Sequence, residues 1–233
     1  MTAVMGDPGS ERVLVYGNSG TCSYAAWEGM QQSGGRSEIA AYINDDPTTP
    51  RIAPDGKPVI VFEEIDTYPG LPVLIPIHLP ADRRMLWERV IAAGRRIIGL
   101  PGDPQWVHPF TTFGEGVIIS STTRILPGVN LARGVIAFSH MLAEEVRVGE
   151  FTTLGMRSMV LGHVEIGANV LVAPGAVINN GRPGHRRTIG DGAVIGTGAV
   201  VSRNVKPGEV LMGNPAMSPA EWDRLKRMMR RGE

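Results

Sequence analysis

The 233-residue sequence predicts an α/β domain, then a solenoid of short parallel strands, and finally a C-terminal helix. Three observations support this fold class. Residues 12–98 alternate short apolar strands with helical segments, residues from Phe113 onward repeat with a period of six, and residues 218–233 carry a capped helical pattern.

The N-terminal domain starts with the order strand, helix, strand. Strands are expected at residues 12–16 and 39–43, with a helix at residues 21–32 that stops at Gly34 and Gly35. A helix that joins two parallel strands is the unit of a doubly wound, Rossmann-like sheet. Further strands are expected at residues 59–62, 73–77 and 96–98, and a further helix at residues 81–94.

The repeat places an apolar anchor at every sixth position, often followed by glycine or alanine. A strand has a side-chain period of two and a helix a period near 3.6, so neither alone gives a repeat of six. A coil of short flat strands does, with one hexad on each face and three hexads to a coil. The anchors are Phe113, Ile119, Ile125, Leu131, Leu142, Val148, Leu154, Val160, Ile166, Val172, Ile178, Ile189, Ile195 and Val201.

Two irregularities interrupt this frame. Leu131 and Val148 are 17 residues apart, one short of three hexads, so the frame shifts in a segment that contains His140. Ile178 and Ile189 are 11 residues apart, five more than one hexad, so the intervening segment is expected to form an extruded loop.

The C-terminal segment has the signals of a short helix. Ser218 stands at the cap, Pro219 at the first helical position, and Glu221 where a capping box requires it. The predicted domains are therefore residues 1–104, residues 105–217 for the solenoid, and residues 218–233 for this helix.

Composition excludes several classes of protein. Lys+Arg and Asp+Glu both number 23, so charge gives no argument for a nucleic-acid or membrane partner. The single Cys22 cannot form an internal disulfide, which fits a reducing compartment. No apolar stretch approaches the roughly 18–20 residues of a membrane span, and residues 1–12 lack a signal-peptide core. A soluble cytoplasmic protein is expected.

Polar residues follow both of the first two strands. Gly17-Asn18-Ser19-Gly20 supplies backbone freedom and exposed N–H groups at the start of the expected helix, where an anion is favoured. This run lacks the full dinucleotide fingerprint. Asp45 and Asp46 follow the second strand and could accept hydrogen bonds from a ribose or a base. The alternative is that they only begin a turn before Pro47.

Several motifs together resemble one family. They are Gly-x-x-Gly after the first strand, Tyr42-Ile43-Asn44-Asp45 at the end of the second, and Val107-His108-Pro109 at the opening of the repeat. Along nearly its whole length the chain is similar to the bacterial sialic acid O-acetyltransferases and the bacillosamine- or perosamine-type sugar N-acetyltransferases. Gly213-Asn214-Pro215-Ala216 matches the Gly-x-Pro-Ala turn by which such hexapeptide-repeat acyltransferases leave the solenoid.

The resemblance implies an N-terminal nucleotide-binding domain of the Rossmann-like βαβ type, a left-handed parallel β-helix (hexapeptide repeat) and a homotrimer. It also implies a nucleotide-linked amino sugar on the first domain and acetyl-CoA along a groove between solenoids. Carried over, the substrate-binding residues would be Gly17, Asn18, Ser19, Gly20, Asp45 and Asp46. The residues that contact acetyl-CoA, or another acyl-CoA, would be Gly155, Gly175, Gly196, Thr197, Gly198, Ala199, Gly213, Asn214, Pro215 and Ala216.

Acyl transfer from a thioester needs a base for the attacking amine or hydroxyl and an N–H group for the oxyanion. The family carries a histidine and then an acidic residue in the segment that matches residues 142–149. Glu144 stands at the position of that histidine, and Glu145 at the acidic position. His140 lies where the frame shifts, so a distorted coil could bring its imidazole to the site, oriented by Glu144 or Glu145. Alternatively Glu144 is itself the base, which would require its burial.

The extruded loop and the remaining histidines carry weaker signals. Arg186 is the loop residue expected to bind substrate phosphates, although a solvated surface loop is an equal alternative. His163 is expected at a subunit surface. A metal site is not expected, because a three-histidine site needs two histidines close together, and His140 and His163 are far apart in the sequence.

The leading prediction is acetyl-CoA-dependent acylation of an amino group on a nucleotide-linked sugar. The enzymatic alternative is O-acylation, or acylation of a non-sugar amine in a specialised biosynthetic pathway. The non-enzymatic alternative is a sugar-nucleotide-binding protein that has lost catalysis. Glu144 in place of the expected histidine favours the last, and the retained Gly213-Asn214-Pro215-Ala216 turn argues against it.

Overall fold

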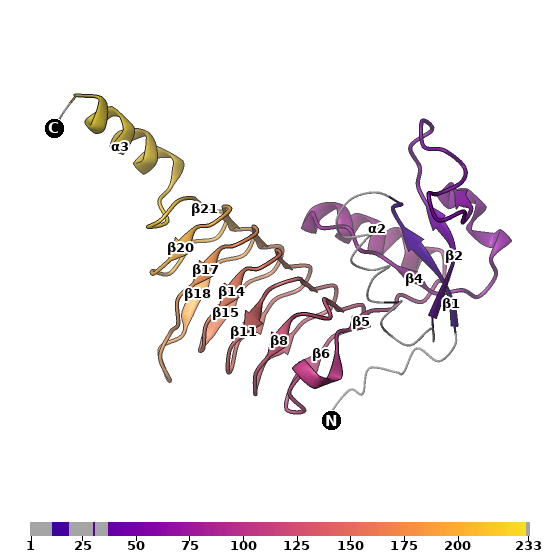
Figure 1. Ribbon diagram of the computed structural model, residues 1–233, viewed down its shortest axis with the longest axis horizontal. Coiled ribbons are helices and arrows are strands. Elements are labelled where there is room, and N and C mark those ends of the chain that lie inside the picture. Colours follow the sequence, from indigo (N-terminus) through magenta and orange to yellow (C-terminus); the bar gives the residue numbers. More distant parts are fainter. Residues whose placement is uncertain (1–10, 19–29, 31–36, 232–233) are drawn as a thin grey trace.

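The computed structural model describes residues 11–18, Met30 and residues 37–231. An α/β part at the N-terminal end leads into a long solenoid, and a helix extends from the far end of that solenoid (Figure 1). The expected helix at residues 21–32 lies outside the described residues, except that Met30 is helical. In the part of the chain that is described, no helix is long and apolar enough to cross a membrane.

The N-terminal domain contains a four-stranded parallel sheet in the order β3-β2-β1-β4. The predicted strands are found, but the later ones are shorter because a 3-10 helix and Pro76 interrupt them. Of residues 96–98, Ile97 forms an isolated bridge with Val73. The elements are β1 (Glu11–Tyr16), β2 (Ser37–Ile43), β3 (Val59–Ile60), η1 (Phe62–Thr67), β4 (Val73–Leu74) and α2 (Pro80–Ala92).

The solenoid is a parallel β-helix with three faces. Its strands are two or three residues long, and each pairs with the strand one coil away. The first face contains β5 (Leu100–Pro101), β7 (Ile118–Ile119), β10 (Ile136–Ala137), β13 (Thr153–Leu154), β16 (Leu171–Val172), β19 (Val194–Ile195) and β21 (Val210–Leu211). The second face contains β8 (Arg124–Ile125), β11 (Met141–Leu142), β14 (Met159–Val160), β17 (Val177–Ile178) and β20 (Val200–Val201). The third face contains β6 (Thr112–Phe113), β9 (Asn130–Leu131), β12 (Arg147–Val148), β15 (Val164–Ile166) and β18 (Arg187–Ile189).

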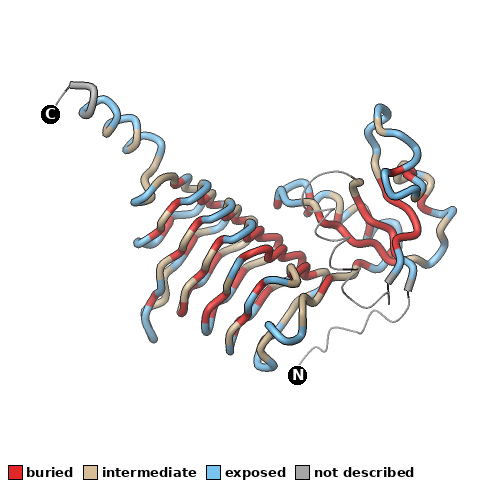
Figure 2. The backbone as a smooth tube through the Cα atoms, in the orientation of Figure 1, coloured by how far each residue is buried: buried red, intermediate tan, exposed pale blue. Residues whose placement is uncertain are grey.

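The register confirms the six-residue repeat. Anchors from successive coils are paired, as Leu142 is with Val160 and Val148 with Ile166. The anchor side chains form one buried core. Buried positions accordingly recur along the coils of the tube in Figure 2. Burying one aliphatic side chain contributes roughly 1.5–3 kcal/mol, so the stacked anchors hold the coils together.

Both irregularities predicted from the spacing are present. The inward anchors Ala137 and Leu142 are five residues apart, one fewer than a hexad, so the short turn is residues 138–140 and includes His140. Between β17 and β18 the chain leaves the coil, and Arg182 and His185 form a small antiparallel bridge. The loop tip, residues 182–185, is exposed.

The outward side chains differ among the three faces. On the first face, Ile118 and Ile136 are buried in a cluster shared with Val13 and Leu74 of the N-terminal sheet. The third face is polar, with Thr112, Asn130, Arg147, Glu165 and Thr188 directed outward. The second face carries an apolar, half-buried column beyond β8, formed by Met141, Met159, Val177 and Val200.

Arg83 joins α2 to the solenoid. Its side chain is buried, and its guanidinium donates hydrogen bonds to the carbonyls of Gly134 and Phe151 and to the hydroxyl of Thr153. The same group donates to the carbonyl of Ile77. One side chain thus connects the N-terminal domain with two coils.

The chain leaves the last coil as predicted. The 3-10 helix η2 (Pro104–Trp106) precedes the first complete coils, and α3 (Pro219–Arg231) follows the last. The capping box of α3 is confirmed, because the Ser218 N–H donates to the Glu221 carboxylate and the Glu221 N–H donates to the Ser218 hydroxyl.

Candidate active site

Four charged or titratable side chains meet at the corner between the second and third faces. We call Glu144, Glu145, His163 and Arg186 the charged corner. Glu145 lies in the turn from β11 to β12, His163 in the turn from β14 to β15, and Arg186 directly before β18. The strand register places Glu145, His163 and Arg186 in one column across three successive coils.

His163 lies between the two carboxylates. Its Nδ1 is 3.2 Å from Glu145 Oε2, and its Nε2 is 4.0 Å from Glu144 Oε1. Arg186 Nη2 donates to the same Glu145 Oε2 at 3.0 Å, and Arg186 Nη1 donates to the Glu145 carbonyl. The His163 side chain is 17% exposed, whereas those of Glu144 and Glu145 are 52% and 55% exposed. The burial that Glu144 would need in order to act alone is therefore absent from the single chain.

Gly162 makes room for this arrangement. A Cβ atom at this position would lie 2.1 Å from Glu144 Oε1, so the carboxylate rests directly on the glycine. Glu145 and His163 both have left-handed backbone conformations, with φ of 56° and 57°. The turn therefore places the two side chains one above the other on adjacent coils.

The residues predicted to contact acetyl-CoA lie along the opposite edge of the second face. We call the turns between the first and second faces the glycine corner, to which Gly155, Gly175 and residues 196–199 belong. Gly175 and Gly198 have positive φ values of 71° and 65°, which any other residue adopts at a cost. The Gly198 N–H donates to the Pro174 carbonyl and so ties one coil to the previous one.

The Gly213-Asn214-Pro215-Ala216 turn continues this edge. The Val200 N–H donates to the Gly213 carbonyl, and the Ala216 N–H donates to the Val200 carbonyl. Met212 and Met217 close the turn with two further backbone hydrogen bonds. Most of the positions predicted to contact acetyl-CoA therefore form a continuous strip along the last coils.

His140 belongs to the glycine corner and not to the charged corner. It is exposed, its N–H donates to the Ser158 carbonyl, and its own carbonyl accepts from Arg124. Because β11 separates it from Glu144, the two residues lie at opposite ends of a strand. Within one chain, the structure does not bring together the predicted pair of His140 and Glu144.

A cavity of about 440 Å³ lies beside the carboxyl ends of the N-terminal strands. Asn18 lines it, and the Asn18 side-chain oxygen accepts a hydrogen bond of 2.7 Å from Asn44. Gly17 precedes Asn18 and has a φ of 87°, while Ser19 and Gly20 lie outside the described residues. The rest of the lining is Thr48, Thr49, Pro50, Ile52 and Pro54.

Asp46 stabilises the turn that borders this cavity. Its Oδ1 accepts hydrogen bonds from the Thr48 hydroxyl at 2.7 Å and from the Thr48 N–H at 2.9 Å. These two bonds hold the pKa of the exposed Asp46 carboxyl below its usual range. The structural role that the sequence left open for Asp46 is therefore present, and one carboxylate oxygen is engaged by the protein.

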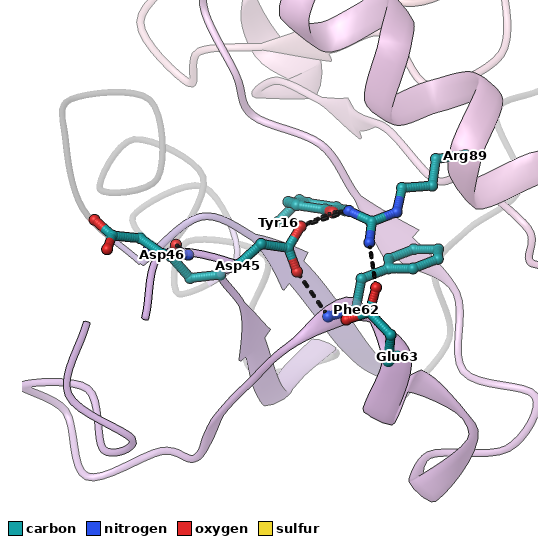
Figure 3. A network of polar contacts seen from close by, with 7 residues as sticks. Tyr16, Asp45, Asp46, Phe62, Glu63 and Arg89 are labelled. Carbon is teal, nitrogen blue, oxygen red and sulfur yellow. Dashed lines mark hydrogen bonds and ion pairs between the residues drawn. The ribbon is translucent and has the colours of Figure 1, made fainter. Parts of the chain in front are cut away.

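Asp45 is held in a network of polar contacts (Figure 3). Its Oδ1 accepts from the Phe62 N–H at 2.8 Å, and its Oδ2 accepts from the Tyr16 hydroxyl at 2.9 Å and from Arg89. The Arg89 guanidinium also pairs with Glu63 at 2.8 Å and lies 4.0 Å from the centre of the Phe62 ring. Both Asp45 oxygens are therefore occupied by groups of the domain itself.

The network shifts two pKa values. Burial alone would raise the pKa of Asp45, but hydrogen bonds from Phe62, Tyr16 and Arg89, with the charge of Arg89, hold it below its usual range. Burial, reinforced by the Asp45 carboxylate, raises the pKa of Tyr16. Tyr16 therefore stays a neutral hydrogen-bond donor to Asp45 in any ordinary buffer.

The sequence predicts no role for Arg89, includes Asn44 only as part of a motif, and places His163 at a subunit surface without a role in the reaction. The sequence does hold a signal for His163, because it lies 18 residues after Glu145, three whole hexads later. No comparable signal identifies Arg89, whose partners lie in other elements. Among the described residues, no group of three or more His, Cys, Asp or Glu side chains is placed to hold a metal ion.

Comparison with known proteins supports the interpretation of the six-residue repeat as a hexapeptide solenoid. Residues 145–180 match the family model described as "Bacterial transferase hexapeptide (six repeats)". GDP-perosamine N-acetyltransferase from Escherichia coli O157:H7 is 31% identical over 170 residues, which are 69% of this chain and 76% of that protein.

Solved structures share the fold. A variant of perosamine N-acetyltransferase from Caulobacter crescentus, in complex with CoA and GDP-perosamine, has a TM-score of 0.78 at 23% identity, covering 88% of this chain and 95% of that one. The acetyltransferase domain of PglB from Neisseria gonorrhoeae, in complex with acetyl coenzyme A, has a TM-score of 0.79 at 21% identity, covering 90% of this chain and 100% of that one.

A parallel β-helix with hexad anchors and glycine-rich turns defines the class of hexapeptide-repeat transferases, and its stacked parallel sheets fit the predicted left-handed coil. Within that class, the chain belongs to the family that contains the Escherichia coli N-acetyltransferase, and it is an acyltransferase.

Proposed function

We propose that the enzyme transfers the acetyl group of acetyl-CoA to an amino group of a nucleotide-linked amino sugar. The observation that carries this proposal is the 31% identity to GDP-perosamine N-acetyltransferase over 76% of that protein. Two surface regions of the structure support the proposal, one for each substrate. A cytoplasmic location is part of the proposal, since the single Cys22 cannot form an internal disulfide.

The nucleotide is expected at the cavity beside Asn18. The order β3-β2-β1-β4 with parallel strands is that of a doubly wound, Rossmann-like half, in which ligands bind beyond the carboxyl ends of the strands. Gly17, Asn18 and Asp46 lie at those ends, and Asn44 holds the Asn18 amide in place. The expected contacts with Ser19 and Gly20 are part of the same proposal.

Acetyl-CoA is expected along the glycine corner. Turns without side chains let an extended ligand approach the backbone closely, and Gly155, Gly175, Gly196 and Gly198 provide such turns on the coils between β13 and β20. Thr197 and Ala199 complete the last of these turns. The 213–216 turn lies at the end of the same edge.

A homotrimer would bring the two corners together. The apolar column of Met141, Met159, Val177 and Val200 is the surface expected to pack against other copies, because it is half-buried and apolar in the single chain. A threefold axis facing this column would place the glycine corner of one subunit beside the charged corner of the next. His140 of one subunit could then approach Glu144 of its neighbour.

The base is expected from the charged corner, because its carboxylates are adjacent to an imidazole and a guanidinium. His140 remains a candidate only in the assembled trimer. Glu145 is the orienting carboxylate in either case, since Arg186 donates one hydrogen bond to its carboxylate and one to its backbone carbonyl. Arg186 accordingly acts through Glu145 in the single chain, and contact with substrate phosphate is a further role we propose for it.

The proposal is tested by the release of CoA thiol from acetyl-CoA with a panel of acceptors. The panel contains GDP- and UDP-linked 4-amino sugars, the matching 4-hydroxy sugars and simple amines. Turnover confined to the amino-sugar nucleotides, with an acetamido product by mass spectrometry, is the expected result. Turnover with hydroxy sugars or simple amines alone would contradict it, and binding of CoA without turnover on any acceptor would indicate a protein that has lost catalysis.

A further inference from the structure

The imidazole of His163 lies next to Glu144 and Glu145. Glu144 stands at the position where the resemblance predicts a histidine, yet this side chain is half exposed and rests on Gly162 beneath His163. His163 comes from the following coil, and 17% of its side chain is exposed. The charged corner therefore contains an imidazole, which His163 contributes from the coil after that of Glu144.

The contacts of His163 favour one tautomer. Nδ1 is 3.2 Å from Glu145 Oε2, so the Nδ1–H form donates a hydrogen bond to this carboxylate. Glu145 is held from its other side by Arg186, which donates to the same oxygen and to the backbone carbonyl. The pairing leaves the lone pair of Nε2 directed away from Glu145.

The surroundings of Nε2 suit the acceptance of a proton. Glu144 Oε1 lies 4.0 Å from it, which is beyond a hydrogen bond but close enough to stabilise an imidazolium. One carboxylate that fixes the tautomer and another that stabilises the charged ring are the supports a histidine base requires. Because Arg186 neutralises part of this negative charge, the corner does not hold two unpaired carboxylates.

We propose that His163 is the general base of the acyl transfer, with Glu145 and Arg186 as positioning residues and Glu144 as the stabiliser of the imidazolium. This inference rests on the proposed function. The amine nitrogen attacks the thioester carbonyl carbon, the C–S bond breaks, and the ammonium proton passes to His163 Nε2. The thiolate of CoA takes that proton as it leaves, so the products are the N-acetyl compound and free CoA thiol.

The first test compares His163→Ala with the wild-type enzyme on the acceptor found in the thiol-release assay. We expect kcat to fall about 10²- to 10⁴-fold, while CoA binding by calorimetry stays within about threefold. Added imidazole should partly restore kcat. His108→Ala, two coils before Glu144 at the N-terminal start of the solenoid, is the matched control and should retain activity.

Substitution of the neighbouring carboxylates distinguishes His163 from the alternative general bases. Glu144→Gln should lower kcat by about 10-fold, since it removes only the stabilising charge. If Glu144→Gln or His140→Ala abolishes turnover and His163→Ala does not, the proposal is wrong. Gly162→Ala adds a sensitive check, because the new Cβ would displace the Glu144 carboxylate, which is the flexible end of its side chain. The kcat of this variant should therefore fall about as far as that of Glu144→Gln.

Imidazole NMR of the full chain tests the geometry without any acceptor. The nitrogen shifts of His163 should report the Nδ1–H tautomer, and Glu145→Gln should lose that preference. A dominant Nε2–H tautomer in the wild-type protein would overturn the proposal even if the panel reveals no substrate. Failure of the wild-type enzyme on every acceptor would count against the proposed function, whereas turnover that survives His163→Ala would count against this inference alone.

Discussion

Asp45 accepts hydrogen bonds from three different elements, and this arrangement decides what the residue does. The Phe62 N–H, the Tyr16 hydroxyl and the Arg89 guanidinium occupy its oxygens in the domain (Figure 3). An aspartate after a strand in a nucleotide-binding half is typical of a ribose contact, but here the fold already satisfies the carboxylate. Only Oδ1, which accepts a single hydrogen bond, keeps room for a further donor, so a ribose contact by Asp45 stays a prediction.

The same network predicts a pH-dependent contribution to stability. Because the pKa of Asp45 in the folded domain is below its ordinary value of 3.8, the carboxylate stabilises the fold above about pH 4. That contribution is lost as the pH falls through the lowered pKa. Asp45→Asn should therefore lower the free energy of unfolding by about 1 kcal/mol at pH 7, a small figure because the side chain is partly exposed.

Urea denaturation at pH 7, 5, 4 and 3 measures this difference. The gap between wild type and Asp45→Asn should be constant at pH 7 and 5 and should shrink below pH 4. Asp82→Asn, an exposed carboxylate on α2, is the control. If the difference in unfolding free energy is unchanged at pH 3, the Asp45→Asn variant is destabilised by altered packing and not by the loss of the negative charge.

The residues show where sequence-based prediction ends. The hexad spacing predicts the anchors, the short turn at His140 and the extruded loop, because backbone register repeats in a regular way. The 18-residue spacing of Glu145 and His163 is visible in the sequence, but Arg186 joins their column across an insertion whose register the sequence does not display. The Asp45 network likewise combines residues from β1, α2 and the segment after β3, whose approach only the folded domain fixes.

At the scale of elements, α2 and the coils are joined through a buried charge. Arg83 donates to the carbonyls of Gly134 and Phe151 and to the Thr153 hydroxyl, which belong to two coils. Trp87, one turn later on α2, packs edge-on against Phe151 with ring centres 5.4 Å apart. Sequence predicts α2 as a helix but not which face carries the junction, since an arginine on a helix is ordinarily exposed.

Arg83→Met should weaken this junction. The substitution keeps an unbranched apolar stem but removes the guanidinium donors, so the buried carbonyls lose partners and the free energy of unfolding should fall by about 2–4 kcal/mol. Thermal unfolding followed by circular dichroism should also become broader, because the N-terminal domain and the solenoid lose their shared clamp.

Arg84→Met provides the matched control. Its side chain is 48% exposed and pairs with Glu88 four residues along the helix, an interaction of small energetic value. We expect a change of less than about 1 kcal/mol for this variant. Equal destabilisation by both substitutions would show that helix packing, and not the buried guanidinium, holds the two parts together.

At the scale of the whole molecule, the positions expected to bind acetyl-CoA and the charged corner lie on opposite edges of the second face. If both assignments are right, a single chain would present only two half-sites. In the proposed homotrimer, each glycine corner would meet the charged corner of the next subunit, which would unite the half-sites and cover the apolar column. Assembly would then be a requirement for catalysis as well as for stability.

Val177→Lys tests this dependence on assembly. A lysine in the centre of the apolar column should leave the solenoid folded but prevent association, because its charge would be desolvated between subunits. Sedimentation should show a trimer for the wild type and a monomer for the variant, with activity lost in parallel. Thr188→Lys, on the polar third face, should remain trimeric and active.

Mixed trimers decide whether the site is shared between subunits. His163→Ala damages the charged corner, and Thr197→Trp should obstruct the glycine corner, so each variant alone should be inactive. In trimers refolded from an equal mixture, a site shared by neighbours has both corners intact in about one quarter of cases. Recovery of about one quarter of wild-type activity is therefore expected. If each site lies within one subunit, the mixture will stay as inactive as its parents, because every subunit then carries one damaged corner of its own.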